Sequence, residues 1–356
     1  MIACISKNDR AGLLFAELAN VRSDIVDLGS IQPSRLIKLL GALSSASLHL
    51  AQMRSDMLFS PVVSGALERK AAARLAGCVS LKHVVQWGAT SFPTPASAVS
   101  HGYSVVTDGP YDPDDPEYPL EWRPVRWHTE FFERQREILR GARFIFTLSE
   151  WARSKVIKVH SIDPTNVIRI GWGPMFQVGP VAAPKPQPPC FVSIGNEWHR
   201  KGMDIVVEAT RQLLPRFPTL KTIIAGKPRG LALSSGPGVH LIPHAISQTE
   251  VVSLISGARA VIVASRFDAS PHIIMESLQL GTPVIGTAIG GIPEAIRPPA
   301  GGRIIPVSDP SALASAMEDI LLGDAETQRL EVLGEVAQAD NWRHAAEILS
   351  AALDRL

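Results

Sequence analysis

Apolar and polar residues follow two alternating patterns through residues 190–290. Longer segments repeat apolar residues at a spacing that predicts helices, at 203–217, 247–258 and 271–281. Short apolar runs that end in glycine or turn residues predict strands at 188–195, 220–226, 239–245, 258–265 and 282–287. This alternation predicts βαβ units around a parallel sheet, and the near-continuous apolar strands indicate that both faces of the sheet are covered.

The first half of the chain shows a similar alternation, with less regular spacing. Apolar runs there predict strands at 1–6, 83–89, 103–109 and 143–149. Amphipathic segments predict helices at 11–21, 130–142 and 149–162, and one more at the end of the chain, over 341–356. A second α/β unit is therefore expected before residue 177.

The composition changes sharply at residues 177–189, QVGPVAAPKPQPP. Proline at this density cannot continue a helix or a central strand, and it stiffens a connection. Because single hydrophobic cores stop growing at about 250–300 residues, a chain of 356 residues is expected to form two domains. We therefore predict an N-terminal α/β domain over 1–176, a linker at 177–189 and a C-terminal α/β domain over 190–340.

The net charge and the cysteine pattern exclude several kinds of partner and site. The formal net charge is +1, so nucleic acid is not expected as a partner. Residues 123–169 carry ten basic and five acidic side chains, which indicates a solvated helix face or an attraction to an anionic membrane or phosphorylated lipid acceptor. The three cysteines form no CxxC pair, which argues against a zinc site or a disulfide framework. With no secretory or membrane-spanning apolar run visible, we expect a cytoplasmic protein, with peripheral contact at the inner membrane face left open.

Candidate chemistry concentrates in residues 265–294, because ligands of open α/β sheets bind beyond the carboxyl ends of the strands. Asp268 follows a predicted strand, and Glu276 lies eight positions later, in the first turns of the next helix. Free backbone N–H groups and the helix dipole at that helix start favour an anionic phosphate. The residues that form this loop and helix start are Ser270, Pro271, His272 and Ile273. A carboxylate inside the helix can accept hydrogen bonds from sugar hydroxyls.

This segment resembles the Glu-x7-Glu motif of family 4 retaining glycosyltransferases (group 1), with Asp268 in place of the first glutamate. The glycines, proline and glutamate that follow in that motif are matched by Gly281, Pro283, Gly290, Gly291 and Glu294. The resemblance implies the GT-B architecture, in which two Rossmann-like, doubly wound domains face each other across a cleft. It also implies that the terminal helix 341–356 packs back on the N-domain. Glu276 would bind the ribose of the donor nucleotide, and Asp268 would lie beside the transferred sugar.

A second segment, FVSIGNEWHRKGMD over 191–204, resembles the Gly-Arg…Lys-Gly loop of the same family. In that family, the basic pair of the loop neutralises the donor diphosphate. Gly195 and Lys201 match that loop, while Asn196 stands at the arginine position and Arg200 stands beside the lysine. A cation here offsets the charge that builds on the leaving diphosphate, a role we predict for Lys201. Arg200 is a second candidate, or a solvated surface cation.

Four further residues complete the candidate site. The loops with Gly226 and His244 would flank the nucleobase, although a lone histidine is more often structural. On the N-terminal side, Gly12 is what remains of the family's glycine-rich loop after the first strand. Asp108 occupies the place of a family histidine near the transferred sugar, or is a turn residue before Gly109 and Pro110.

The predicted function is the retaining transfer of a hexose-type sugar from a UDP- or GDP-type nucleotide-sugar donor, without a metal ion or other cofactor. The acceptor is expected to be a glycan or a lipid-linked sugar. Two alternatives stay open. One is a non-catalytic nucleotide-sugar-binding protein, which the departures at Asn196 and Asp268 and the missing histidine would suit. The other is a nucleotide-sugar epimerase on the same architecture, which would need acids and histidines around the sugar that the sequence does not show.

Overall fold

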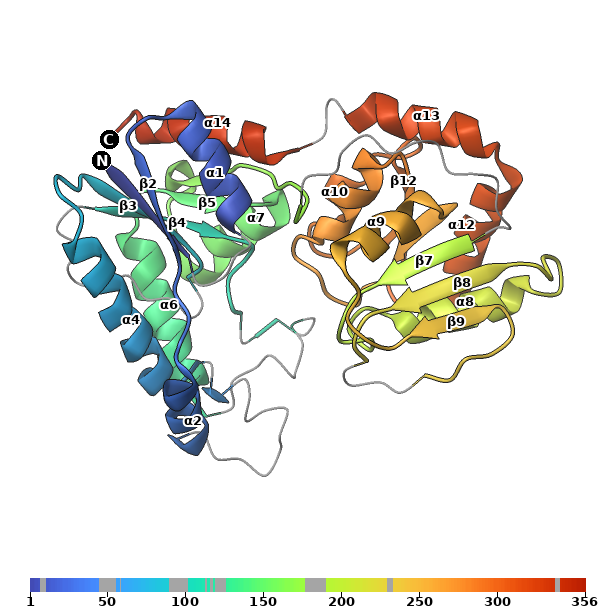
Figure 1. Cartoon of the computed structure of the whole chain (residues 1–356), viewed down its shortest axis with the longest axis horizontal. Coiled ribbons are helices and arrows are strands. Elements are labelled where there is room, and N and C mark those ends of the chain that lie inside the picture. The colour runs from blue at the N-terminus through green and yellow to red at the C-terminus, as the bar shows by residue number, and fades with distance from the viewer. Residues whose placement is uncertain are drawn as a thin grey trace. The chain divides into compact units, whose positions relative to one another are not determined.

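The chain folds into two α/β units in this computed structural model (Figure 1). The structure describes residues 1–6, 11–44, 56–57, 59–89, 102–112, 114–115, 118, 126–176, 190–228, 233–336 and 340–356. One compact unit comprises Met1–Gly171 together with Trp342–Leu356, and the other comprises Trp172–Asn341. The proline-rich segment 177–189, predicted to be a linker, lies outside the described residues.

The first unit has a six-stranded parallel sheet with the strand order β2-β1-β3-β4-β5-β6. The strands are β1 (Ile2–Ser6), β2 (Ile25–Ser30), β3 (His83–Trp87), β4 (Tyr103–Thr107), β5 (Ile145–Thr147) and β6 (Val167–Arg169). The helices are α1 (Gly12–Val21), α2 (Arg35–Ser44), α4 (Pro61–Ala76), α6 (His128–Gly141), α7 (Glu150–His160) and α14 (Trp342–Leu353), with a 3₁₀ turn at η3 (Pro164–Asn166). Four of the strands are completely buried, as the apolar runs predicted.

Helix α14, at the end of the chain, belongs to the first unit and packs against α1 (Figure 1). The Trp342 indole meets the edge of the Trp87 ring, with the ring centroids 6.0 Å apart. Arg22, just after α1, donates hydrogen bonds to the carbonyl of Ser350 at 3.2 Å and to the carboxylate of Asp354. Aromatic packing and polar contacts thus hold the last helix to the first one, 328 residues away in the sequence.

The second unit also has a six-stranded parallel sheet, with the order β12-β11-β10-β7-β8-β9. Its strands are β7 (Cys190–Ile194), β8 (Lys221–Ala225), β9 (Val239–Ile242), β10 (Ala260–Val263), β11 (Val284–Thr287) and β12 (Gly302–Ile305). Its helices are α8 (Met203–Leu213), α9 (Gln248–Ser256), α10 (His272–Gln279), α11 (Ile292–Ala295), α12 (Pro310–Leu322) and α13 (Ala325–Val336). This is the strand order of a dinucleotide-binding sheet. From β7 to β9 successive strands are added toward one edge, and from β10 to β12 they are added toward the other edge. The order therefore reverses between the neighbouring strands β7 and β10.

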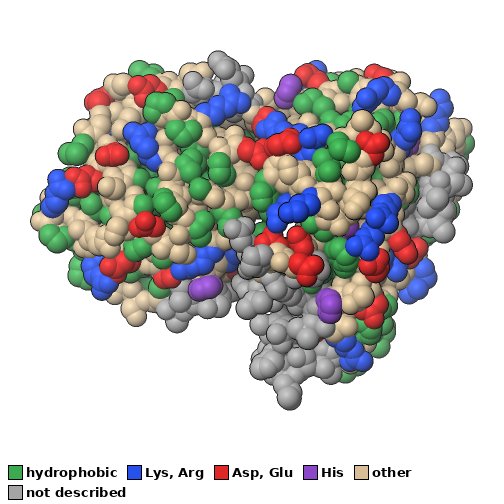
Figure 2. All heavy atoms as spheres, turned by 180° about the vertical axis from the view of Figure 1, so that it is seen from behind, with side chains coloured by type: hydrophobic (Ala, Val, Ile, Leu, Met, Phe, Trp, Pro, Cys, Tyr) green, Lys and Arg blue, Asp and Glu red, His purple; other side chains and the backbone are tan. Residues whose placement is uncertain are grey.

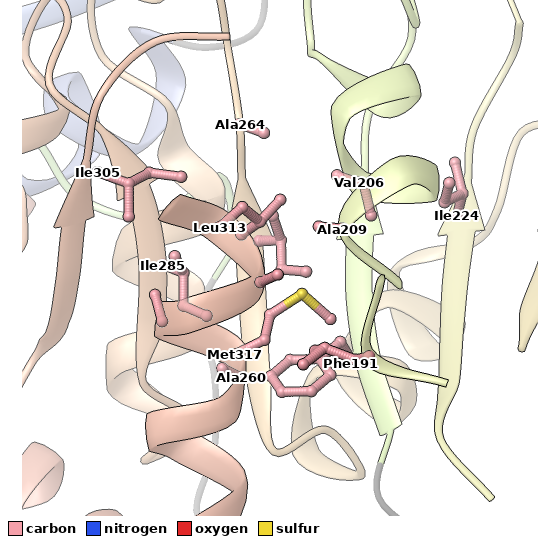
Figure 3. Close-up of a cluster of buried hydrophobic side chains, with 14 of the residues drawn as sticks. Phe191, Val206, Ala209, Ile224, Ala260, Ala264, Ile285, Ile305, Leu313 and Met317 are labelled. Carbon is pink, nitrogen blue, oxygen red and sulfur yellow. The ribbon is translucent and has the colours of Figure 1, made fainter. Parts of the chain in front are cut away.

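The core of the second unit lies between this sheet and helices α8 and α12 (Figure 3). Phe191 on β7 and Met317 on α12 are fully buried, and the small side chains Ala209 and Ala260 allow the helices and strands to approach closely. Helix α9 begins with a capping box, in which Ser247 and Glu250 satisfy each other's backbone N–H groups. Strands β7 and β10 both contribute side chains to this core, and candidate residues lie in the loops that follow them.

Charged side chains of both signs are interspersed over the face drawn in Figure 2, in keeping with a net charge of +1. Among the described residues, no helix combines the length and the apolar character needed to cross a membrane.

Candidate functional site

The candidate residues of the second unit cluster where the order of its sheet reverses, between the neighbouring strands β7 and β10. The loop after β7 carries Lys201, and the loop after β10 carries Asp268. Open α/β sheets bind ligands in the crevice outside the carboxyl ends of the strands, at the point where the strand order reverses. Lys201 and Asp268 lie on the two loops that border this point.

Close backbone packing shapes the loop between β7 and α8. Gly202 has a φ of +66°, and a Cβ atom there would overlap the carbonyl oxygen of Ala264 at the end of β10. Gly226, with a φ of +121°, leaves no room for a Cβ beside the carbonyl of Gly195. The Lys201 chain lies over Gly195, where an ideal Cβ would stand 3.2 Å from Cγ of Lys201. These glycines let the loops after three neighbouring strands meet and direct the lysine across them.

Lys201 and Asp268 form an ion pair at this point, with Nζ of Lys201 2.5 Å from Oδ2 of Asp268. The same oxygen accepts a hydrogen bond from the Ser265 hydroxyl at 3.2 Å and lies 3.5 Å from Nη1 of Arg200. Arg200 is only 9% exposed, and its guanidinium also contacts the Glu197 carboxylate at 2.9 Å. Two cations and two acids thus form one ionic cluster.

Burial and charge act in opposite directions on this cluster. Burial lowers the pKa of Lys201, although its attraction to Asp268 opposes that effect. Burial would raise the pKa of Asp268, but Lys201 and Arg200 outweigh it, so the pKa of that carboxyl lies below its ordinary value. Asp268 is therefore a carboxylate at neutral pH. Within the described residues its second oxygen, Oδ1, has no hydrogen-bond partner and can accept one from a ligand.

Glu276 lies in the second turn of α10 and is only 4% exposed. Its Oε1 accepts a hydrogen bond from the backbone N–H of Met175 at 3.1 Å. Burial raises the pKa of Glu276 to about 7, against the opposing effect of that hydrogen bond. One turn earlier on the same helix, Nδ1 of His272 is 2.7 Å from the carbonyl of Gly173. The segment that opens the second unit is thus held by two side chains of α10.

The start of α10 has no side-chain cap. Pro271 stands at its N-cap position and has no side-chain group that could cap the helix. Ser270 is buried beside it, and Ile273 lies in the first turn. Gly290 presses on the Asp268 carbonyl so closely that a Cβ atom there would overlap it. The loop after β11 therefore supports the loop that carries Asp268.

Three other candidate residues lie on the β8 and β9 side of the same sheet. The exposed Asn196 accepts a hydrogen bond through Oδ1 from the backbone N–H of Lys227 at 2.7 Å, next to Gly226. His244, also exposed, contacts the carbonyl of its neighbour Ala245 through Nδ1 at 3.0 Å. These contacts leave the His244 ring at the surface of the loop after β9.

Gly12 and Asp108 belong to the first unit. Gly12 opens α1, and a Cβ added there would meet nothing within 4 Å. Residues 7–10, which precede it, lie outside the described residues. Asp108 follows the buried strand β4 directly, at the carboxyl end of that sheet.

Sequence reasoning missed three groups at the site: Ser265, Glu197 and the backbone N–H of Met175. Ser265 ends the apolar run of β10, so its position after a buried strand was a usable signal. Glu197 has a left-handed φ of 61°, which no sequence pattern indicated. Among the described residues, no three His, Cys, Asp or Glu side chains are arranged to hold a metal ion.

Comparison with known protein families adds to this geometry. Residues 180–338 match the family model described as "Glycosyl transferases group 1". The D-inositol 3-phosphate glycosyltransferase of Mycobacterium marinum is 24% identical over 225 residues, which are 56% of this chain and 47% of that protein. The enzyme of the same name from Corynebacterium diphtheriae is 28% identical over 172 residues, 44% of this chain and 40% of that protein. The chain thus spans about half the length of the curated relatives it matches.

Solved structures resemble the whole chain. Sucrose-phosphate synthase from Thermosynechococcus elongatus has a TM-score of 0.71 at 16% identity, covering 99% of this chain and 98% of that one. A UDP-forming α,α-trehalose-phosphate synthase from Burkholderia xenovorans has a TM-score of 0.67 at 10% identity, with 99% and 98% covered. At these identities the likeness shows the fold. The predicted resemblance to group 1 glycosyltransferases and the predicted GT-B fold of two Rossmann-like domains are confirmed.

Proposed function

We propose that this chain, whose residues 180–338 match the group 1 glycosyl transferases, moves a hexose-type sugar from a nucleotide-diphosphate donor to an acceptor. The observation that carries the proposal is the Lys201–Asp268 ion pair at the reversal point of the second sheet. This ion pair brings a cation and a carboxylate to the loop that leads into α10, whose start has no side-chain cap. The buried Glu276 lies in the second turn of the same helix.

Each charged group then has a part of the donor to bind. The Lys201 ammonium and the Arg200 guanidinium stabilise the diphosphate as negative charge develops on the leaving group. Glu276 accepts hydrogen bonds from the ribose hydroxyls. The free Oδ1 of Asp268 accepts one from a hydroxyl of the transferred sugar, while Oδ2 stays with Lys201. Asn196, Gly226 and His244 flank the nucleobase.

We further propose that the reaction needs no metal ion and retains the anomeric configuration. Two partly buried cations next to the developing charge supply the stabilisation that a divalent ion gives elsewhere. Lys201 and Ser265 hold Oδ2 of Asp268, and we assign its Oδ1 to a hydrogen bond with the sugar, so we propose no covalent bond between Asp268 and the sugar. The leaving phosphate would instead take the proton of the acceptor hydroxyl.

The donor is proposed to carry UDP, because a fold neighbour is a UDP-forming synthase. GDP remains the second choice to test. The relatives act on an inositol phosphate, so a phosphorylated small polyol joins a glycan and a lipid-linked sugar among the acceptors to be tried. We also propose that residues 177–189 link the two domains and that the enzyme works in the cytoplasm.

Thermal-shift measurements with UDP, GDP and their sugars test donor binding directly. A ligand at one hundred times its dissociation constant stabilises the protein by about 2.7 kcal/mol, which gives a visible shift in Tm. Lys201→Met should weaken diphosphate binding about ten- to a hundredfold, because a charged hydrogen bond is worth roughly 1.5–3 kcal/mol. Lys221→Met, at an exposed lysine on the opposite end of β8, is the matched control. Equal affinity in Lys201→Met and the wild type would remove Lys201 from the site.

A further inference from the structure

Glu197, in the loop between β7 and α8, adopts a backbone conformation that suits glycine. Its φ is 61°, in the left-handed region, where a Cβ atom crowds the following carbonyl oxygen. The Glu197 carbonyl accepts a hydrogen bond from the backbone N–H of Lys201 at 3.0 Å, so this residue opens the turn that carries the lysine. Residues other than glycine adopt this conformation at a cost in stability, and they gather at functional sites. The side chain of Glu197 is therefore expected to have a role that glycine could not fill.

The Glu197 carboxylate holds one edge of the Arg200 guanidinium. Its Oε2 lies 2.9 Å from both Nε and Nη2 of Arg200. A guanidinium is a rigid planar fork, so an acid that fixes this edge also sets the direction of the third nitrogen, Nη1. The side chains of Glu197 and Arg200 are 25% and 10% exposed, and such partly buried pairs are screened less by salt than surface pairs.

Arg200 in turn holds the loop after β10. Its Nη1 donates a hydrogen bond to the Phe267 carbonyl at 2.8 Å and lies 3.5 Å from Oδ2 of Asp268. Its own carbonyl accepts a hydrogen bond from the backbone N–H of Arg266 at 2.8 Å. Arg200 thus contacts three consecutive residues of this loop, and the last of them is the carboxylate that pairs with Lys201.

We propose that Glu197 is a positioning residue for sugar transfer, which acts through Arg200 on Asp268 and makes no contact with the donor. Without the Glu197 carboxylate, two adjacent cations, Arg200 and Lys201, would share Asp268. Arg200 would then leave the Phe267 carbonyl and compete with Lys201 for Oδ2 of Asp268. With Glu197 in place, Nη1 of Arg200 stays on the loop and Oδ2 stays with Lys201. This role rests on the proposed function.

Turnover and binding measurements on Glu197 variants test this role. Nucleotide release is measured from UDP-glucose, UDP-N-acetylglucosamine and GDP-mannose. Affinity is measured with the nucleoside diphosphate of the donor that the wild type uses fastest. Glu197→Gln keeps the shape of the side chain and removes its charge, and Glu197→Gly also relieves the left-handed φ. Glu208→Gln is the matched control, because Glu208 forms a pair of the same i,i+3 spacing with Arg211 on α8.

Both Glu197 variants are expected to lower kcat about tenfold, the effect of losing one charged hydrogen bond. Diphosphate affinity should change by less than about threefold, because losing a nearby negative charge favours the diphosphate while a loosened Arg200 disfavours it. In chemical denaturation Glu197→Gly should be more stable than Glu197→Gln, since glycine adopts a φ of 61° without crowding. The more stable variant should be no more active. Glu208→Gln should match the wild type in kcat and in affinity.

A double-mutant cycle shows whether Glu197 acts through Arg200. In the Arg200→Gln protein, adding Glu197→Gln should lower kcat by less than about twofold, because the contact is already broken. Three results would overturn the role of Glu197 and leave the proposed function intact: wild-type kcat in Glu197→Gln, effects of the two substitutions that multiply, or equal losses of kcat and diphosphate affinity. A wild-type protein that releases no nucleotide from any of the three donors would refute the proposed function, and the role of Glu197 with it.

Discussion

Replacing Glu276 by glutamine is expected to stabilise the unliganded protein while weakening its nucleotide binding. Burial raises the pKa of Glu276 from 4.5 to about 7, since the side chain is only 4% exposed. An acid whose pKa is raised by folding favours the folded state below pH 4.5 and loses that contribution as the pH rises through 7. A shift of this size corresponds to about 3 kcal/mol. Glutamine stays neutral, so the variant should be more stable by up to about 3 kcal/mol at pH 8 and similar to the wild type near pH 4.5.

Nucleotide binding should respond in the opposite direction. In the proposed site the ribose hydroxyls donate to the ionised Glu276, so the carboxyl must lose its proton before it binds. Wild-type affinity for UDP should therefore fall about tenfold for each pH unit below 7. At pH 8, Glu276→Gln should bind about ten- to a hundredfold more weakly. Titration calorimetry of both proteins at pH 6 and 8 isolates Glu276, because ionisation of the UDP phosphate affects both equally.

Chemical denaturation at pH 5 and 8 completes the test, with Glu331→Gln as a control on the exposed side of α13. The control should change neither stability nor affinity. If Glu276→Gln binds UDP as tightly as the wild type at pH 8, the ribose assignment is wrong. If the variant is less stable than the wild type at pH 8, then the buried, ionised Glu276 does not destabilise the folded protein as the structure indicates.

Two other substitutions test the ionic cluster and the loop that holds it. Asp268→Asn removes the charge partner of Lys201 and should lower turnover of the donor tenfold or more while changing UDP affinity less, because its contacts strengthen in the transition state; unchanged nucleotide release would exclude Asp268 from sugar binding. Gly202→Ala should destabilise the protein by roughly 2–4 kcal/mol, since it forces a Cβ against the Ala264 carbonyl at a φ of +66°. A loss below about 0.5 kcal/mol in denaturant would contradict that packing.

The completely buried, apolar strands of both sheets were predicted from the sequence. Strands β10 and β11 are buried at every residue, and both lie inside predicted apolar runs. Strand β2, at the edge of the first sheet, has no fully buried residue, so its sequence IVDLGS gives a weak alternation that was not predicted. Helix α2 was not predicted either, and its apolar periodicity marks a face that the fold leaves exposed rather than its packed side.

Only the parts of the site that depend on spacing within one short segment could be predicted from the sequence. The eight-residue interval between Asp268 and Glu276 follows from one loop and the helix after it, and the sequence shows it directly. The contact between Lys201 and Asp268 joins residues 67 positions apart and requires β7 to lie next to β10. The hydrogen bond from Met175 to Glu276 spans 101 positions. Local patterns do not fix strand order, so neither contact could be read before the sheets were known.

The central claim is that the chain takes a sugar from a nucleotide diphosphate and keeps its anomeric configuration. Proton NMR of purified protein with UDP-sugar and GDP-sugar donors, in the presence and absence of candidate acceptors, tests it most directly. Release of the nucleotide should accompany formation of a product whose first-formed anomer matches that of the donor. The Lys201→Met protein should show at most a tenth of that rate. A first-formed product of inverted configuration, or equal rates for wild type and Lys201→Met, would contradict the account.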